Sequence, residues 1–112
     1  MVARFVQDGR SIDYTPGAAV AAGDVVVQGD LLGIAKVPIA ANALGALAVE
    51  GVYEMPKATG VGAGIAAGAK VYWKAASKVV QADSESGANK YVGKVVKAAA
   101  DGDATVLVRL EQ

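Results

Sequence analysis

The sequence contains no cysteine and no histidine among its 112 residues. Without cysteine the chain can form neither a disulfide nor a cysteine metal site, and without histidine it cannot use a mechanism that depends on imidazole. Aromatic residues are also scarce, with one Trp, four Tyr and one Phe, and much of the apolar content is Ala and Val. Such small side chains fill a narrow core or a close subunit contact, so the composition indicates one modest domain and favours an oligomer.

The chain has no excess of either charge. Its 11 basic and 11 acidic residues give a formal net charge of zero, and its arginines, Arg4, Arg10 and Arg109, lie far apart in the sequence. Non-specific binding to nucleic acid depends on a concentrated positive patch. We therefore expect no nucleic-acid partner.

Long apolar runs are absent as well. The longest uncharged apolar stretch lies between Lys36 and Glu50 and is interrupted by a proline and an asparagine. It is too short and too broken to span a bilayer. The first residues reach Asp8 and Asp13 before any apolar stretch develops, which is not the pattern of a signal peptide. The sequence predicts a soluble protein without a membrane partner.

What the chain does contain is a pattern that occurs twice. Gly23-Asp-Val-Val-Val27 returns as Gly68-Ala-Lys-Val-Tyr72, Leu32-Gly-Ile34 returns as Val92-Gly-Lys94, and the apolar run 46–53 is matched by 104–110. Short Val-rich runs separated by Gly and Asp are typical of strands joined by tight turns. We predict an N-terminal arm and linker over residues 1–20 and a single β domain with an internal pseudo-repeat over residues 21–112.

The spacing of the apolar runs predicts an all-β fold, a small β-barrel or tulip-like domain with an extended N-terminal arm. The candidate strands are 24–28, 31–37, 46–54, 69–74, 78–81, 90–97 and 104–110. In the last strand Val106, Val108 and Leu110 should face the core, by strand alternation. Val71 and Trp73 should also be buried. Ala-rich composition favours at most one short helix, near residues 39–46.

Residues 1–14 combine apolar anchors with polar neighbours. The anchors Phe5, Val6, Ile12 and Tyr14 precede a Thr-Pro-Gly turn and an Ala/Gly linker. One interpretation is an arm that binds a partner, with these four residues as its contacts. The other is an edge strand of the same sheet. The sequence leaves both open.

The Gly-rich stretch 59–70 invites a nucleotide-binding interpretation. It has no register with the spacing of a P-loop, in which backbone amides and a lysine together hold phosphates. The segment 62–67 does fit a dinucleotide-binding pattern, with Asp83 about twenty residues further on. However, Lys70-Val-Tyr-Trp73 indicates a strand where the helix of that motif should continue. A flexible loop is the preferred interpretation.

Other candidates for chemistry are equally weak. Glu50 and Glu54, if they share one strand, lie about 13 Å apart at ~3.3 Å per residue, whereas glycosidase pairs need roughly 5–9.5 Å. Asp101 and Asp103 flank a glycine as turn residues do. No serine has an imidazole to activate it. We predict no catalytic site, no metal site and no cofactor.

Tyr72 and Trp73 lie beside Lys70 and Lys74, and aromatic residues next to cations can stack on bases. A single such pair on a neutral protein more commonly consists of a core aromatic residue and a solvated rim. We interpret the pair in that way.

Several short motifs together resemble the small decoration, or cement, proteins of tailed bacteriophage and prophage capsids. They are Phe5-Val-Gln-Asp-Gly9 with Ile12-Asp-Tyr14, Gly23-Asp-Val-Val-Val27, Leu32-Gly-Ile-Ala35, Ala48-Val-Glu-Gly-Val52 with Pro56-Lys57, Val71-Tyr-Trp73 and Val106-Leu-Val-Arg-Leu110. Their order and spacing extend over nearly the whole chain. Similar chains are also labelled as RecA/RadA-type phage recombinases, which would imply ATP binding, and the missing P-loop and basic patch disfavour that label.

The resemblance implies a structural virion protein on the outer surface of the expanded head, made in the bacterial host cytoplasm. It further implies that the partners are the major capsid protein and other copies of the chain, often in a homotrimer. It implies no catalytic residues. The alternatives are another non-enzymatic β-rich oligomeric interaction module or, less favoured and suggested only by the recombinase label of similar chains, an accessory protein of phage DNA recombination.

Overall fold

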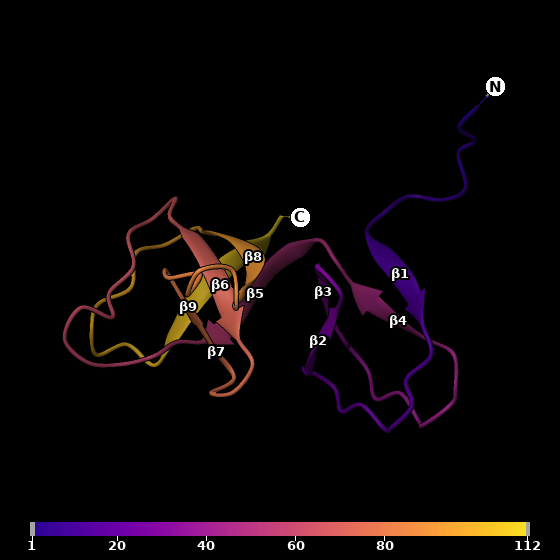
Figure 1. Cartoon of the computed structure of the whole chain (residues 1–112), viewed down its shortest axis with the longest axis horizontal. Coiled ribbons are helices and arrows are strands. Elements are labelled where there is room, and N and C mark those ends of the chain that lie inside the picture. The colour runs from indigo at the N-terminus through magenta and orange to yellow at the C-terminus, as the bar shows by residue number, and fades with distance from the viewer. Residues whose placement is uncertain (1, 112) are drawn as a thin grey trace.

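A computed structural model of the chain describes residues 2–111, which form nine strands and no helix. The strands make two antiparallel sheets that lie side by side (Figure 1). The first sheet contains β1 (Ser11–Tyr14), β2 (Val25–Gln28), β3 (Leu31–Ile34) and β4 (Gly45–Ala48). The second contains β5 (Gly51–Pro56), β6 (Lys70–Lys74), β7 (Val79–Gln81), β8 (Lys90–Val95) and β9 (Thr105–Leu110). The predicted all-β class is confirmed, although neither sheet closes into a barrel.

The two sheets have the same internal order. The first runs β1-β4-β3-β2 and the second runs β5-β9-β8-β6, with β7 added beyond β6. Equivalent turns precede β2 and β6: Gly23 and Gly68 both have positive φ, 88° and 85°. The Gly23 amide donates to the Ala35 carbonyl at 2.6 Å, and the Gly68 amide donates to the Val95 carbonyl at 2.7 Å. The chain therefore builds one four-stranded motif twice, and only the second has a fifth strand.

The predicted strand 46–54 is wrong in one respect, because the chain breaks it into two strands of different sheets. β4 ends at Ala48, and β5 begins at Gly51, whose φ of 122° lies in a region that side chains disfavour. This turn at residues 49–51 carries the chain from the first sheet to the second. Gly51 therefore marks a change of direction in the chain rather than a position inside one continuous strand.

Residues 39–46, the place predicted for at most one short helix, form none. Ile39 forms an isolated antiparallel bridge with Val20, and Asn42 has a φ of 63°, which asparagine tolerates better than most residues. A Cβ on Gly45 would lie 2.6 Å from side-chain carbons of Ile39, so the chain folds back tightly at this point. Tertiary contact overrides the helix propensity of alanine here.

Side chains from both sheets form the main core. Leu32 and Ile34 of β3 belong to the same buried cluster as Val71, Trp73 and other residues of the second sheet. Trp73 is 7% exposed and Val71 is fully buried, as predicted. The predicted alternation of the last strand is also confirmed, because Val106, Val108 and Leu110 are all buried while Thr105 and Arg109 are exposed.

Candidate partner-binding surfaces

The N-terminal segment 2–10 lies outside both sheets. It leaves β1 and runs away from the body of the molecule (Figure 1). Phe5 is 79% exposed and Val6 is 81% exposed, so two of the four predicted contact residues are fully available to a partner. The side-chain amide of Gln7 donates to the Ser11 carbonyl at 3.3 Å, close to the point where the segment joins the sheet.

The other two predicted contact residues lie in a strand. Ile12 and Tyr14 belong to β1, which pairs with β4 from Ser11↔Ala48 to Tyr14↔Gly45. Both are half-buried and pack against the small cluster of Ala35, Ile39 and Leu47. For residues 11–14 the structure thus shows the edge-strand alternative, and it does not bring Ile12 and Tyr14 together with Phe5 and Val6 on one surface.

Each sheet has strand edges at its margins, where extended partner segments can pair. β1 and β2 form the margins of the first sheet, and β5 and β7 form those of the second. A groove of about 560 Å³ lies between β2 and the second sheet. Its lining residues are Val20, Gly23, Asp24, Val25, Val26, Val27, Pro56, Trp73, Ala75 and Lys78. In the second sheet the equivalent edge is that of β6, which β7 covers.

The outward face of the second sheet carries a row of cations, which we call the basic row: Lys70, Lys94 and Arg109. Lys70 of β6 is paired with Lys94 of β8, and Lys94 is paired with Arg109 of β9. The rings of Tyr72 and Tyr91 lie next to the row with centroids 5.7 Å apart. Burial, with help from the nearby Glu111 carboxylate, raises the pKa of Tyr91.

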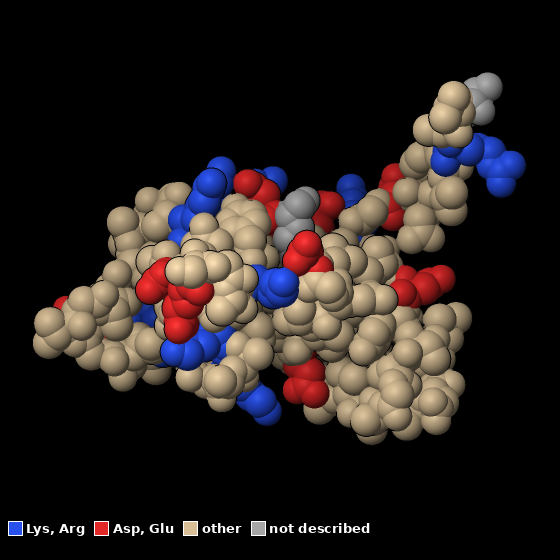
Figure 2. Space-filling model, viewed as in Figure 1, with Lys and Arg blue, Asp and Glu red and all other residues tan. Residues whose placement is uncertain are grey.

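Sequence reasoning missed this row because its members are 15 to 39 positions apart along the chain and meet only through strand pairing. The suspected aromatic pair is divided by strand alternation, with Trp73 in the core and Tyr72 outward. On the face drawn in Figure 2, basic and acidic side chains are interspersed without an extended region of one sign. The basic row is therefore a local feature of an electrically mixed surface.

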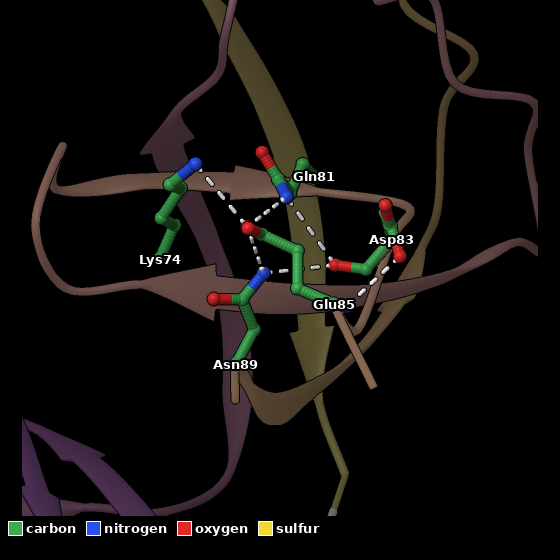
Figure 3. Close-up of polar contacts among 5 residues, drawn as sticks. All are labelled: Lys74, Gln81, Asp83, Glu85 and Asn89. Atoms are coloured by element: carbon green, nitrogen blue, oxygen red, sulfur yellow. Dashed lines mark hydrogen bonds and ion pairs between the residues drawn. The ribbon is translucent and has the colours of Figure 1, made fainter. Parts of the chain in front are cut away.

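A polar network orders the loop between β7 and β8 (Figure 3). One oxygen of Glu85 accepts hydrogen bonds from the side-chain amides of Gln81 at 2.8 Å and Asn89 at 2.9 Å, and it lies 3.2 Å from the ammonium of Lys74. These donors, Asn89 first, lower the pKa of Glu85. Asn89 also donates to the Asp83 carbonyl at 2.9 Å. The network fixes the loop rather than forming an open site.

The Gly-rich stretch is anchored to the loop before β9. Ile65 is buried and forms an isolated bridge with Ala99. The amide of Gly64 donates to a carboxylate oxygen of Asp101 at 2.7 Å. A carboxylate of the protein itself therefore lies where an anionic ligand of this stretch would have to bind.

The acidic residues suggested as a pair are arranged differently from the prediction. Glu50 lies in the turn before β5 and is 3.8 Å from Arg10, while Glu54 lies on β5, so they do not share one strand. Within residues 2–111 no group of three or more acidic side chains could hold a metal ion. No helix in that range is long and apolar enough to cross a membrane.

A family model described as phage cement protein matches residues 6–110 of the chain. No curated protein and no solved structure matches. The matched region contains both sheets and begins within the exposed N-terminal segment.

Proposed function

Because the chain belongs to the phage cement protein family, whose role is structural decoration of the capsid, we propose that it binds the outside of the expanded head as a homotrimer and stabilises it. The family match over both sheets is the observation that carries this proposal. The partners are then the major capsid protein and further copies of the chain, and the chain is made in the cytoplasm of the bacterial host. We propose neither a catalytic activity nor a nucleic-acid partner.

Stabilisation by such a protein follows from mass action. A ligand that binds the assembled shell and not its separated subunits stabilises the shell by RT ln(1 + [L]/Kd) per site. A trimer that contacts several neighbouring subunits binds the shell more tightly than a single copy does, because its second and third contacts become intramolecular. Modest contacts by each copy are then sufficient.

We propose that residues 1–14 supply a principal contact with the coat protein, with Phe5, Val6, Ile12 and Tyr14 as anchors. The exposed positions of Phe5 and Val6 support a direct role for these two side chains. Ile12 and Tyr14 are half-buried, so their contribution comes through β1, whose outer margin is open to an added strand. The extended segment 2–10 loses conformational entropy when it docks, and the burial of Phe5 and Val6 offsets that loss.

The double variant Phe5→Ala/Val6→Ala tests this contact without disturbing either sheet. We expect its dissociation constant for expanded heads, measured by cosedimentation, to rise at least tenfold. The control is Leu44→Ala/Val61→Ala, which removes two exposed apolar side chains elsewhere and should bind as the wild type does. Deletion of residues 2–10 should have the stronger effect while leaving β1 in place. Unchanged affinity of the deletion variant would show that the segment is not a capsid contact.

A further inference from the structure

We propose that the outward face of the second sheet, centred on the basic row of Lys70, Lys94 and Arg109, docks a cluster of carboxylate side chains on the coat protein. This inference rests on the proposed function and adds a second surface to it. The N-terminal segment 2–10 leads into β1 of the first sheet, whereas the basic row lies on the second sheet, so the two contacts are made by different parts of the molecule.

The basic row is unfavourable in the isolated chain. Residues directly opposite each other on neighbouring antiparallel strands have Cβ atoms only about 4.5–5.5 Å apart, and like charges in such pairs destabilise a sheet. Here two consecutive pairs, Lys70↔Lys94 and Lys94↔Arg109, place three cations side by side. A carboxylate-bearing partner would relieve this repulsion on binding.

The chain itself neutralises the row incompletely. Glu111 lies 3.3 Å from Lys94 and 3.3 Å from Arg109, using one oxygen for each, and the same carboxylate accepts from the Tyr91 hydroxyl at 3.4 Å. Among the described residues Lys70 has no ion pair. One carboxylate cannot neutralise three cations, so the row can still pair with carboxylates of a partner.

The surroundings of the row have the composition of a binding interface. Tyr72 and Tyr91 adjoin it, and Val52 of β5, which is paired with Arg109, is 55% exposed. Interfaces are enriched in tyrosine and arginine, and their energetic centres combine aromatic or apolar contact with a few directed polar groups. The sheet face thus offers contact area beside its charges.

A discrete carboxylate cluster fits this face better than a continuous polyanion does. Glu54 points outward from β5 on the same side, and Glu111 lies among the cations, so acids flank the row. With a formal net charge of zero the chain also lacks the field that draws proteins to DNA. The partner should therefore carry two or three carboxylates at fixed positions, as a folded protein surface does.

The test compares two triple variants with the same change of charge. Lys70→Gln/Lys94→Gln/Arg109→Gln removes the basic row, and Lys36→Gln/Lys78→Gln/Lys97→Gln removes three lysines from exposed positions outside the row and outside the N-terminal segment. For expanded heads we expect at least a tenfold rise in the dissociation constant with the first variant, together with a weaker dependence of affinity on salt. The second variant should bind within twofold of the wild type. The melting temperature of the first variant should be equal to or above that of the wild type, because repulsion is removed.

The outcomes separate this inference from the proposed function. Absence of binding by the wild-type chain would overturn both. Binding by the wild type with equal affinity of the row variant would overturn only the role of the basic row. If the row variant loses binding to duplex DNA that the wild type shows, but binds expanded heads with wild-type affinity, the partner of the row is a nucleic acid and the inference is wrong.

Discussion

At the scale of single residues, two glycines show how closely the strands approach. A Cβ on Gly33 would lie 2.8 Å from the Cβ of Leu47, across the β3–β4 contact. A Cβ on Gly93, in the equivalent strand β8, would meet the carbonyl oxygen of Arg109 on β9. Since backbone cannot move aside as a flexible side chain can, glycine at position 93 is a condition for pairing β8 with β9.

We therefore expect Gly93→Ala to separate β8 from β9 locally and to destabilise the fold by about 1–3 kcal/mol, the usual cost of overpacking. Urea unfolding followed by circular dichroism measures this cost. Gly102→Ala is the matched control, because a Cβ at that position meets nothing within 4 Å. Equal midpoints for the two variants would contradict the close approach at Gly93.

At the scale of elements, the loop between β7 and β8 depends on an ionised carboxylate. The bonds from Asn89 and the other donors lower the pKa of Glu85 from its ordinary value of 4.5. A lowered pKa in the folded state means that the carboxylate stabilises the loop above about pH 4.5, and that this contribution is lost as the pH falls through the folded value.

Acidification should therefore loosen this loop before it unfolds the sheets. We expect the amide of Asn89, which donates to the Ser84 carbonyl at 3.0 Å, to lose protection from hydrogen exchange as the pH falls below 4.5, relative to strand amides and after correction for intrinsic rates. Glu85→Gln should show the weakened protection already at neutral pH and little further change on acidification. Protection that is independent of pH in the wild type would contradict the role of the carboxylate.

At the scale of elements, most of the strands could be predicted from the sequence. Runs of valine between Gly and Asp predicted β2, β3 and β6 to β9 nearly in place, because local turn chemistry and strand alternation determine them. Local patterns do not contain the close contact of Ile39 with Gly45, which leaves residues 40–45 without a helix, or the change of sheets at residues 49–51. For the candidate surfaces the sequence predicted Phe5 and Val6 as contacts, and both side chains are exposed, but the basic row depends on pairings that no local pattern contains.

At the scale of the whole molecule, the two sheets share a core although they share no strand. Leu32 of the β2–β3 hairpin is fully buried in the cluster that also contains Trp73, and Lys90 of β8 bonds to Asp30 at the tip of that hairpin at 2.8 Å. The first sheet and the second therefore support each other through this hairpin.

Leu32→Ala should consequently destabilise both sheets together, by about 2–5 kcal/mol. The fluorescence of Trp73, the single tryptophan, reports on the second sheet, and we expect its urea midpoint to fall together with the midpoint of the far-UV signal. Leu44→Ala, at a position that is 72% exposed, should leave both midpoints unchanged. Loss of far-UV signal at a lower urea concentration than the Trp73 transition would mean that the sheets unfold separately.

The short turn at residues 49–51 has a consequence for how copies of the chain meet. Only Val49 and Glu50 separate β4 from β5, and Gly51 takes a φ of 122° where the chain passes from the first sheet to the second. If this hinge straightens, the β2–β3 hairpin leaves its own second sheet and can insert Leu32 and Ile34 into that of another copy. Such an exchange, known as domain swapping, reuses identical contacts and costs little. In this structure the short linker keeps the β2–β3 hairpin packed on the second sheet of its own chain.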